Sequence, residues 1–311
     1  MGLRPFRFGL QLPSATDGRA WRDTARAAED LGYSTLWMPD HLDDQWGPLV
    51  GLTAAAAATT TIRVGALVFA NDYRHPAILA KEAATLDLVS EGRLEMGMGA
   101  GWLRSDYDEY GLPYDTPGTR IERLGEAVHV VKAMWAGGKV TFDGRHYQLR
   151  EARGAPRPVQ RPHPPLLVGG GGRNVLTLAA READIVGFNT NLSAGRIGPE
   201  VARSALAARF AERVAWVRQA AGRRFDDLEL QCHTSFCLVG ADRRATAAAM
   251  APAFGITAEE ALDVPVALVG SVEEICDTLE QRRERYGFSY WAVPGDACAA
   301  FAPVVARLAG R

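Results

Sequence analysis

The sequence predicts one (β/α)8 barrel spanning residues 1–311. Strand-like runs alternate with amphipathic helical runs along the whole chain, and eight such pairs follow one another without a break. A chain of 311 residues has the length of one large barrel. Between the fifth strand and its helix stands a run of four glycines at 169–172. An open, doubly wound sheet is the alternative, and the count of eight favours the barrel.

The predicted strands are short and apolar, and glycine or proline closes several of them. They are expected at 8–12, 35–38, 63–68, 93–98, 166–168, 184–188, 228–239 and 288–293. The seventh is the longest. Its alternation places Gln231 and His233 on one face and Cys232 on the other.

The helices between the strands carry recognisable start and stop signals. They are expected at 21–31, 49–59, 76–90, 121–135, 200–221 and 298–308, with others beginning near 174, 242 and 271. Gly32 ends the first helix and Pro76 begins the third, at the position where proline fits best. Ser271 and Glu274 have the spacing of a capping box.

The segment 139–164 departs from this alternation. Residues 140–148 read as a hairpin around Asp143-Gly144, and five prolines then punctuate an extended connection. We interpret the segment as an insertion before the fifth strand.

Composition excludes several classes of protein. The net charge of −2 gives no footprint for nucleic acid. The cysteines, at 232, 237, 276 and 298, lack metal-site spacing, so free buried thiols are expected and no metal. With neither a secretory signal pattern nor an apolar run long enough to span a bilayer, the sequence predicts a cytoplasmic protein that does not bind membranes.

The glycine run predicts an anion site. Glycines allow a ligand to approach the main chain closely, and the helix that follows offers unpaired N–H groups and a positive dipole end. Strand, glycines and helix together most often bind phosphate. A tight turn without a ligand is the alternative. The run lacks both the spaced third glycine of dinucleotide-binding loops and the Gly-Lys-Ser/Thr of Walker loops.

Several stretches, taken in order, resemble the bacterial luciferase-like monooxygenase superfamily, and most of all its branch that uses the deazaflavin coenzyme F420. They are Ala-Glu-Asp-Leu-Gly-Tyr-Ser-Thr-Leu-Trp-Met-Pro-Asp-His at 28–41, His-Pro at 75–76, Leu-Asp-Leu-Val-Ser-Glu-Gly-Arg at 86–93, Gly-Met-Gly-Ala-Gly-Trp at 97–102 and Pro-Pro-Leu-Leu-Val-Gly-Gly at 164–170.

The resemblance implies a barrel that binds a flavin-type ring in its mouth and the tail phosphate at the glycine loop. It implies Asp40 as a contact to F420 and His41 as the acid–base group. It also implies a non-prolyl cis peptide beneath the ring, by position Ala66-Leu67. Homodimers are usual in the family and are expected here.

Other candidates extend this expected site. Gly169, Gly170, Gly171, Ser105 and Arg173 are expected at the phosphate, and Asn71 at the ring or substrate. The substrate pocket is expected to include Trp46, His75, Trp102 and His233. For three of these a structural role is the alternative: Trp46 as part of the pocket wall, His75 as a helix cap and His233 as a buried, hydrogen-bonded histidine.

Trp102 departs from the related sugar-phosphate dehydrogenases, which carry a glutamate there. The sequence therefore predicts an F420-dependent oxidoreductase acting on a small, apolar organic substrate other than glucose 6-phosphate. A reduced-FMN monooxygenase on the same fold and a non-catalytic flavin-binding barrel are the alternatives. A phosphate-binding isomerase barrel fits less well, because the loops carry apolar tryptophans.

Overall fold

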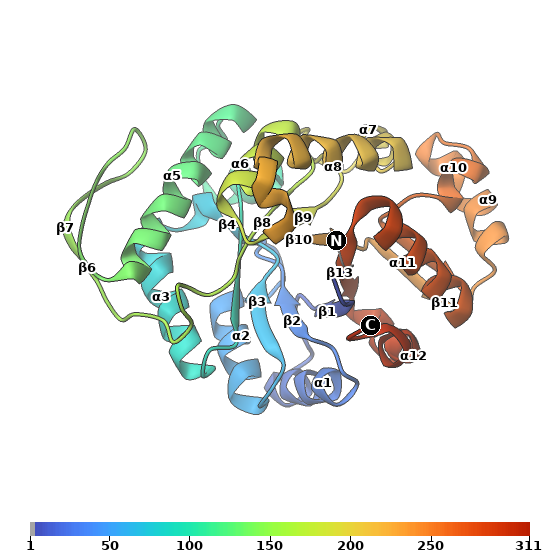
Figure 1. Ribbon diagram of the computed structural model, residues 1–311, viewed down its shortest axis with the longest axis horizontal. Coiled ribbons are helices and arrows are strands. Elements are labelled where there is room, and N and C mark those ends of the chain that lie inside the picture. The colour runs from blue at the N-terminus through green and yellow to red at the C-terminus, as the bar shows by residue number, and fades with distance from the viewer. Residues whose placement is uncertain (1–3) are drawn as a thin grey trace.

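Eight parallel strands close into a barrel in the computed structural model, which describes residues 4–311 (Figure 1). The strands are β1 (Arg7–Gln11), β2 (Thr35–Met38), β3 (Arg63–Ala66), β5 (Leu94–Gly99), β8 (Leu166–Gly170), β9 (Ile185–Phe188), β10 (Glu229–His233) and β13 (Phe288–Pro294). Pairing of β3 with β5 closes the ring, and β4 (Phe69–Ala70) continues the β3 position along β5. The predicted fold class is confirmed.

An outer ring of helices covers the barrel. It consists of α1 (Gly18–Asp30), α2 (Pro48–Ala58), α3 (Pro76–Val89), α5 (Pro117–Ala136), α6 (Arg173–Glu182), α8 (Ala207–Ala221), α11 (Val272–Tyr286) and α12 (Cys298–Leu308). Their inner faces are apolar, as Trp21, Ala25 and Ala28 of α1 show by being almost wholly buried. The expected signals operate: Gly32 has a φ of 82°, and Ser271 with Glu274 forms the capping box.

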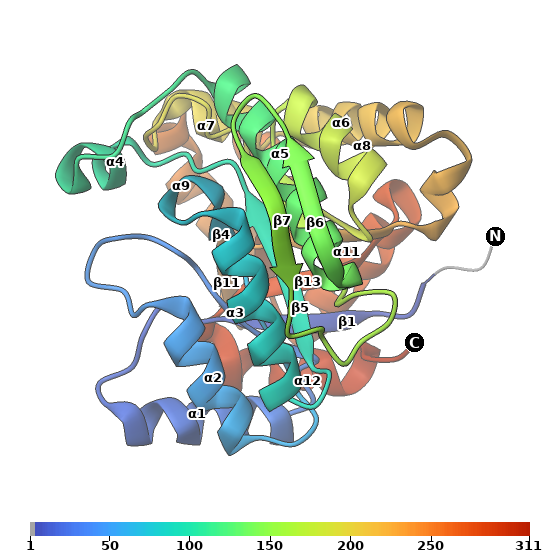
Figure 2. The same ribbon diagram turned by 90° about the vertical axis from the view of Figure 1, so that its left-hand side faces the viewer.

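Further helical elements lie in the connections between the barrel strands and the outer helices. They are η1 (Asn71–Tyr73), α4 (Arg104–Tyr110), α7 (Pro199–Ser204), η2 (Gly222–Asp227), α9 (Arg243–Phe254), α10 (Ala258–Leu262) and η3 (Gly295–Ala297). The predicted insertion is present as the antiparallel hairpin β6 (Gly138–Asp143) and β7 (Gln148–Gly154) (Figure 2). Its turn is held by Glu126 of α5, whose carboxylate accepts from the N–H groups of residues 145–147.

The prediction of one long seventh strand at 228–239 was wrong. Its first half is β10, which pairs with β9 and β13 in the barrel. The second half is β11 (Phe236–Val239), which leaves the barrel and pairs with β12 (Ala267–Gly270). The backbone changes partner between Thr234, whose N–H donates to Ala292 (2.9 Å), and Ser235, whose N–H donates to Val266 (2.8 Å). The alternating pattern continues through this change, so the sequence does not mark it.

The prediction of one helix over 200–221 was also wrong. Leu206 has extended backbone angles (φ −58°, ψ 145°) and separates α7 from α8.

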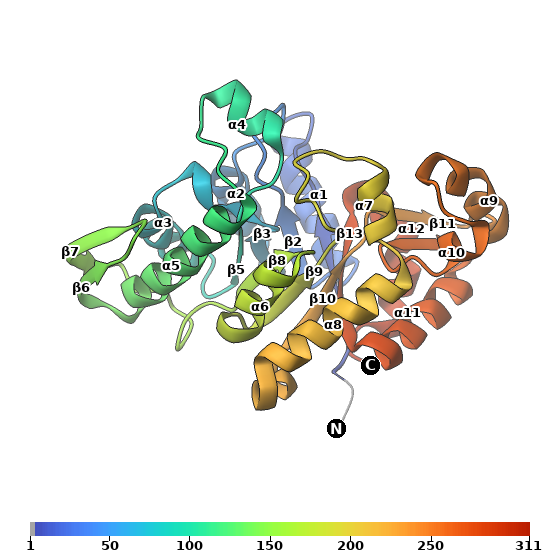
Figure 3. The same cartoon turned by 90° about the horizontal axis from the view of Figure 1, so that it is seen from above.

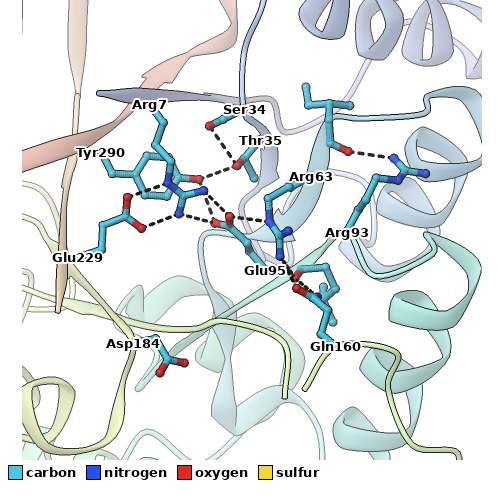
Figure 4. Close-up of polar contacts among 12 residues, drawn as sticks. Arg7, Ser34, Thr35, Arg63, Arg93, Glu95, Gln160, Asp184, Glu229 and Tyr290 are labelled. Atoms are coloured by element: carbon cyan, nitrogen blue, oxygen red, sulfur yellow. Dashed lines mark hydrogen bonds and ion pairs between the residues drawn. The ribbon is translucent and has the colours of Figure 1, made fainter. Parts of the chain in front are cut away.

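At the lower end of the barrel, where the strands begin, a buried glutamate is the centre of an ion-pair network. Glu95 of β5 forms ion pairs with Arg7 of β1 (2.5 Å) and Arg63 of β3 (2.8 Å), and accepts a hydrogen bond from Tyr290 of β13 (3.1 Å) (Figure 4). Arg7 also donates to Glu229 of β10. One network therefore joins five of the eight strands at the end where they begin.

Within residues 4–311, no helix is both long enough and apolar enough to span a bilayer. The four cysteines are free thiols; Cys232 and Cys276 are buried, whereas Cys237 and Cys298 are partly exposed.

Candidate functional site

A cavity of about 930 Å³ opens at the end of the barrel where the strands finish. Residues at and after the ends of strands form its wall, among them 39–41 after β2, 99–102 at the end of β5, 169–172 at the end of β8 and 187–193 at the end of β9. This is the end at which barrel enzymes place their sites. The cavity collects eight of the predicted site residues: Asp40, His41, Leu67, Trp102, Gly169, Gly170, Gly171 and His233.

The glycine run lies on this wall and leads directly into α6. Gly171 has no room for a side chain, because a Cβ there would lie 2.1 Å from the carbonyl oxygen of Thr190. Gly172 is the N-cap of α6 and lacks a side chain to accept from the first N–H groups of the helix. These donors and the helix dipole are therefore available to an anion at the cavity wall.

A buried arginine supports the loop from behind. Arg213 of α8 donates from Nε to the carbonyl of Gly171 (2.8 Å) and from Nη1 to that of Ser204 (2.7 Å). Burial lowers the pKa of Arg213 to about 10, so the guanidinium is still charged at neutral pH. Its positive charge adds to the helix dipole beside the glycines.

His41 is held in a defined orientation. Its Nδ1 lies 2.8 Å from Oδ2 of the buried Asp106, which also accepts from the Tyr73 hydroxyl (2.7 Å). An ionised carboxylate only accepts, so Nδ1 carries the proton and Nε2 is the second functional atom of the ring. Trp102 packs edge-on against the imidazole, with ring centroids 5.7 Å apart. Burial and the bond to Asp106 raise the pKa of Tyr73, which keeps its hydroxyl as a donor.

The carboxylate of Asp40, next to His41, is already hydrogen-bonded by other residues of the protein. Its carboxylate binds both terminal nitrogens of Arg74 (2.5 and 2.9 Å) and accepts from the N–H of Ala70 (2.9 Å). Asp40 therefore fixes the segment between β4 and α3 against the end of β2, while remaining on the cavity wall.

Gln11, at the end of β1, joins two parts of the cavity floor. Its Nε2 donates to the carbonyl of Leu67 (2.9 Å), and its Oε1 accepts from Nε2 of His233 (2.9 Å). Burial lowers the pKa of His233 to about 4, so the ring is neutral and Nδ1 is an acceptor. Within residues 4–311, neither Nδ1 of His233 nor the amide atoms of buried Gln231 have a hydrogen-bond partner.

The non-prolyl cis peptide is present but one residue later than predicted. It joins Leu67 to Val68, and not Ala66 to Leu67. Ala66 is the last residue of β3 and is fully buried in the core, whereas Leu67 and Val68 both line the cavity.

The remaining predicted residues lie outside the cavity lining. Trp46 packs on Trp21 of α1 (5.6 Å between ring centroids). His75 caps α3 by accepting from the N–H of Ala77 (3.2 Å), which is the structural role held open above. Asn71 is buried and donates to the hydroxyl of Tyr147 (3.0 Å).

Two predicted phosphate contacts are exposed. Ser105 lies in the first turn of α4, and Arg173, the first residue of α6, lies over the ring of Trp216 (6.0 Å).

Four further residues line the cavity or hold its wall and were not among the candidates predicted from sequence: Gln11, Asp106, Arg213 and Gln231. Two of them carried a usable signal. Gln11 closes the first strand, and Arg213 stands in the apolar stripe of α8 among Phe210, Val214 and Val217. Asp106 lies in α4 among other polar residues, and nothing in the sequence separates it from its neighbours.

Fold and site together define a (β/α)8 barrel with a glycine loop and an uncapped helix N-terminus after its fifth barrel strand, and a largely apolar cavity at its mouth. The chain belongs to the luciferase-like monooxygenase family, whose model matches residues 2–288.

Named relatives fall into two cofactor groups. An F420-dependent glucose-6-phosphate dehydrogenase of Nakamurella multipartita is 31% identical over 234 residues, covering 72% of this chain and 66% of the relative. An FMNH2-dependent dimethylsulfone monooxygenase of Pseudomonas putida is 30% identical over 208 residues, covering 60% and 57%. Matches to the curated F420-dependent relatives span 50% to 66% of their length.

A solved structure supports the fold along the whole chain. The coenzyme F420-dependent tetrahydromethanopterin reductase of Methanopyrus kandleri superposes with a TM-score of 0.79 at 21% identity, with 98% of each chain covered.

Proposed function

We propose that this chain is an F420-dependent oxidoreductase that transfers a hydride between the deazaflavin and a small, apolar organic substrate. The observation that carries the proposal is the uncapped N-terminus of α6, which lies behind four glycines on the wall of the cavity. Such a loop suits a cofactor whose acidic tail carries a phosphate.

The residues present fit this cofactor. The phosphate would be held by 169–172 and the first N–H groups of α6, with Arg213 behind them. The ring would lie over Leu67 and Val68, with Asp40, His41 and Trp102 around it. Bound F420 would supply the hydride chemistry, since it exchanges a hydride at its ring.

The protein would bind, orient and exclude water. With Nδ1 committed to Asp106, His41 would take up or release the accompanying proton at Nε2. Trp102 would shield that proton transfer from solvent by covering one edge of the imidazole. The apolar indole also stands where the sugar-phosphate dehydrogenases of the branch carry a glutamate, which favours a substrate other than glucose 6-phosphate.

A reduced-FMN monooxygenase is the second candidate, and the Pseudomonas putida relative is the observation that favours it. Both cofactors carry a phosphate that the glycine loop would accept.

A cofactor screen tests the proposal. The purified chain is titrated with F420, FMN, FAD and NADPH, while melting temperature and F420 fluorescence are recorded. We expect F420 to raise the melting temperature most and to lose fluorescence on binding. Stabilisation by FMN alone, with oxygen uptake when FMN is reduced, would replace the proposal by the second candidate. No response to either would refute both.

A further inference from the structure

The cavity continues from the barrel mouth into a side chamber, which we call the annex. Residues of β11, α9, α10, β12 and the segments between them line it, including Ala247, Met250, Ala251, Phe254, Ile256 and Val266. The annex exists because β11 leaves the barrel to pair with β12, so α9 and α10 cover this small sheet and not the barrel. Figure 3 shows α9 and α10 to one side of the barrel, beyond α7.

Most of the annex wall is apolar, although Arg243, Thr246, Thr278 and Arg282 also line it. Ala247 and Ala251 stand one turn apart on the inner side of α9 and are both buried, so their small side chains leave space where larger ones would fill it. Nearby cations are turned toward the main chain: Arg282 donates to the carbonyls of Val264 (2.9 Å), Pro265 (3.1 Å) and Ala267 (2.8 Å). Arg243 donates to the carbonyl of Leu262 (2.7 Å).

The polar end of the same cavity lies at the barrel mouth. There the amide of Gln231 and Nδ1 of His233 have no hydrogen-bond partner among the residues that the structure describes. A hydroxyl group both donates and accepts a hydrogen bond, and so complements these atoms. The cavity is therefore polar at the reacting end and apolar along its extension, and its 930 Å³ is near the upper end of ligand pockets, roughly 300–1,000 Å³.

We infer that the substrate is an elongated alcohol, or the corresponding carbonyl compound, whose alkyl body occupies the annex and whose oxygen reaches Gln231 and His233. This inference rests on the proposed function. In the oxidation, the carbinol carbon would give a hydride to the deazaflavin, and the hydroxyl would give its proton to Nε2 of His41, the base of the proposed function. A carbon–oxygen double bond forms, and reduction is the reverse.

The test is a binding series read by calorimetry, which requires no turnover. Butan-1-ol, hexan-1-ol and octan-1-ol are titrated into the full chain with and without F420. Each added methylene should tighten binding about fourfold, corresponding to about 0.8 kcal/mol per buried CH2. Equal affinity across the series for the wild-type chain would overturn the inference.

A matched pair of variants locates the effect. Ala247→Leu fills the annex, whereas Ala248→Leu makes the same change at the next residue of α9, on the exposed side. We expect Ala247→Leu to weaken octan-1-ol at least tenfold and butan-1-ol less than twofold, with Ala248→Leu unchanged. Equal effects of the two variants would contradict the location. Should Ala247→Leu not fold, the wild-type series still decides.

The outcomes separate this inference from the proposed function. Chain-length dependence without F420 binding would leave the annex standing and remove the deazaflavin. F420 binding without chain-length dependence would leave the proposed function standing and remove the annex as the substrate site.

Discussion

At the residue scale, the site depends on side chains that orient one another. His41 has two ring nitrogens, and only the bond to Asp106 decides which of them carries the proton in the neutral ring. Gln11 does the same for His233: because its amide nitrogen is committed to Leu67, its oxygen must face the imidazole.

The Asp106→Asn variant tests this control of His41. An amide can donate to Nδ1, so the proton should move to Nε2 and the acceptor at Nε2 should be lost. Nitrogen-15 NMR of histidine-labelled protein at neutral pH reads the tautomer directly. The wild type should show a protonated Nδ1, and the variant a protonated Nε2.

Tyr73→Phe is the matched control, because it removes the other hydrogen bond to Asp106 and leaves His41 paired. Its tautomer should equal that of the wild type. An unchanged tautomer in Asp106→Asn would show that the carboxylate does not set the protonation of His41.

At the element scale, the local sequence pattern predicted strands and helices correctly where each element stays in one sheet or one helix. Apolar strands followed by glycine or proline gave most of the barrel, and the glycine run marked the loop before α6. The pattern failed at 228–239, where the chain changes sheets while its alternation continues. It failed again at Leu206, where an ordinary leucine interrupts a helical stretch.

Local pattern also limited what could be predicted of the candidate site. Residues at or just after strand ends, such as Gly169 and His41, were predicted together because a barrel brings strand ends together, and both line the cavity. Trp46 and Asn71 lie outside the cavity lining, because a loop residue can turn to the core and sequence does not reveal the direction. Asp106 and Arg213 act through tertiary contacts with distant segments, which no local spacing records.

At the scale of the whole molecule, the ion-pair network and the cavity lie at opposite ends of the barrel. Glu95 and its ion pairs with Arg7 and Arg63 lie at the lower end, where the strands begin, whereas the cavity lies at the upper end, where they finish. Substitutions at the lower end should therefore change stability without changing the site.

Glu95→Ala leaves Arg7 and Arg63 without their shared buried partner. Removing one member of a buried ion pair costs about 3–5 kcal/mol of unfolding free energy, which urea denaturation measures. Glu122→Ala, which breaks the exposed pair with Arg145, should cost less than about 1 kcal/mol. F420 affinity should change less than twofold in both. A large loss of affinity in folded Glu95→Ala would show that the two ends are coupled.

The central claim is that the N-terminus of α6 holds the cofactor phosphate, and Gly172→Asp tests it most directly. Replacing Gly170 is less informative, because a Cβ there would lie 2.4 Å from Val175, whereas Gly172 has open space around it. Aspartate is a preferred N-cap, so the helix should be as stable as before or more so. Its carboxylate would take the N–H donors and repel the phosphate. Gly47→Asp is the control, since Gly47 is the N-cap of α2, also in open space and outside the cavity lining.

The measurement is the dissociation constant of F420, followed by its fluorescence, for the wild type and both variants. Gly172→Asp should bind F420 at least tenfold more weakly, while Gly47→Asp matches the wild type and a deazaflavin without the phosphate binds all three alike. Equal F420 affinity in Gly172→Asp and the wild type would contradict the account, because the phosphate would then be held elsewhere.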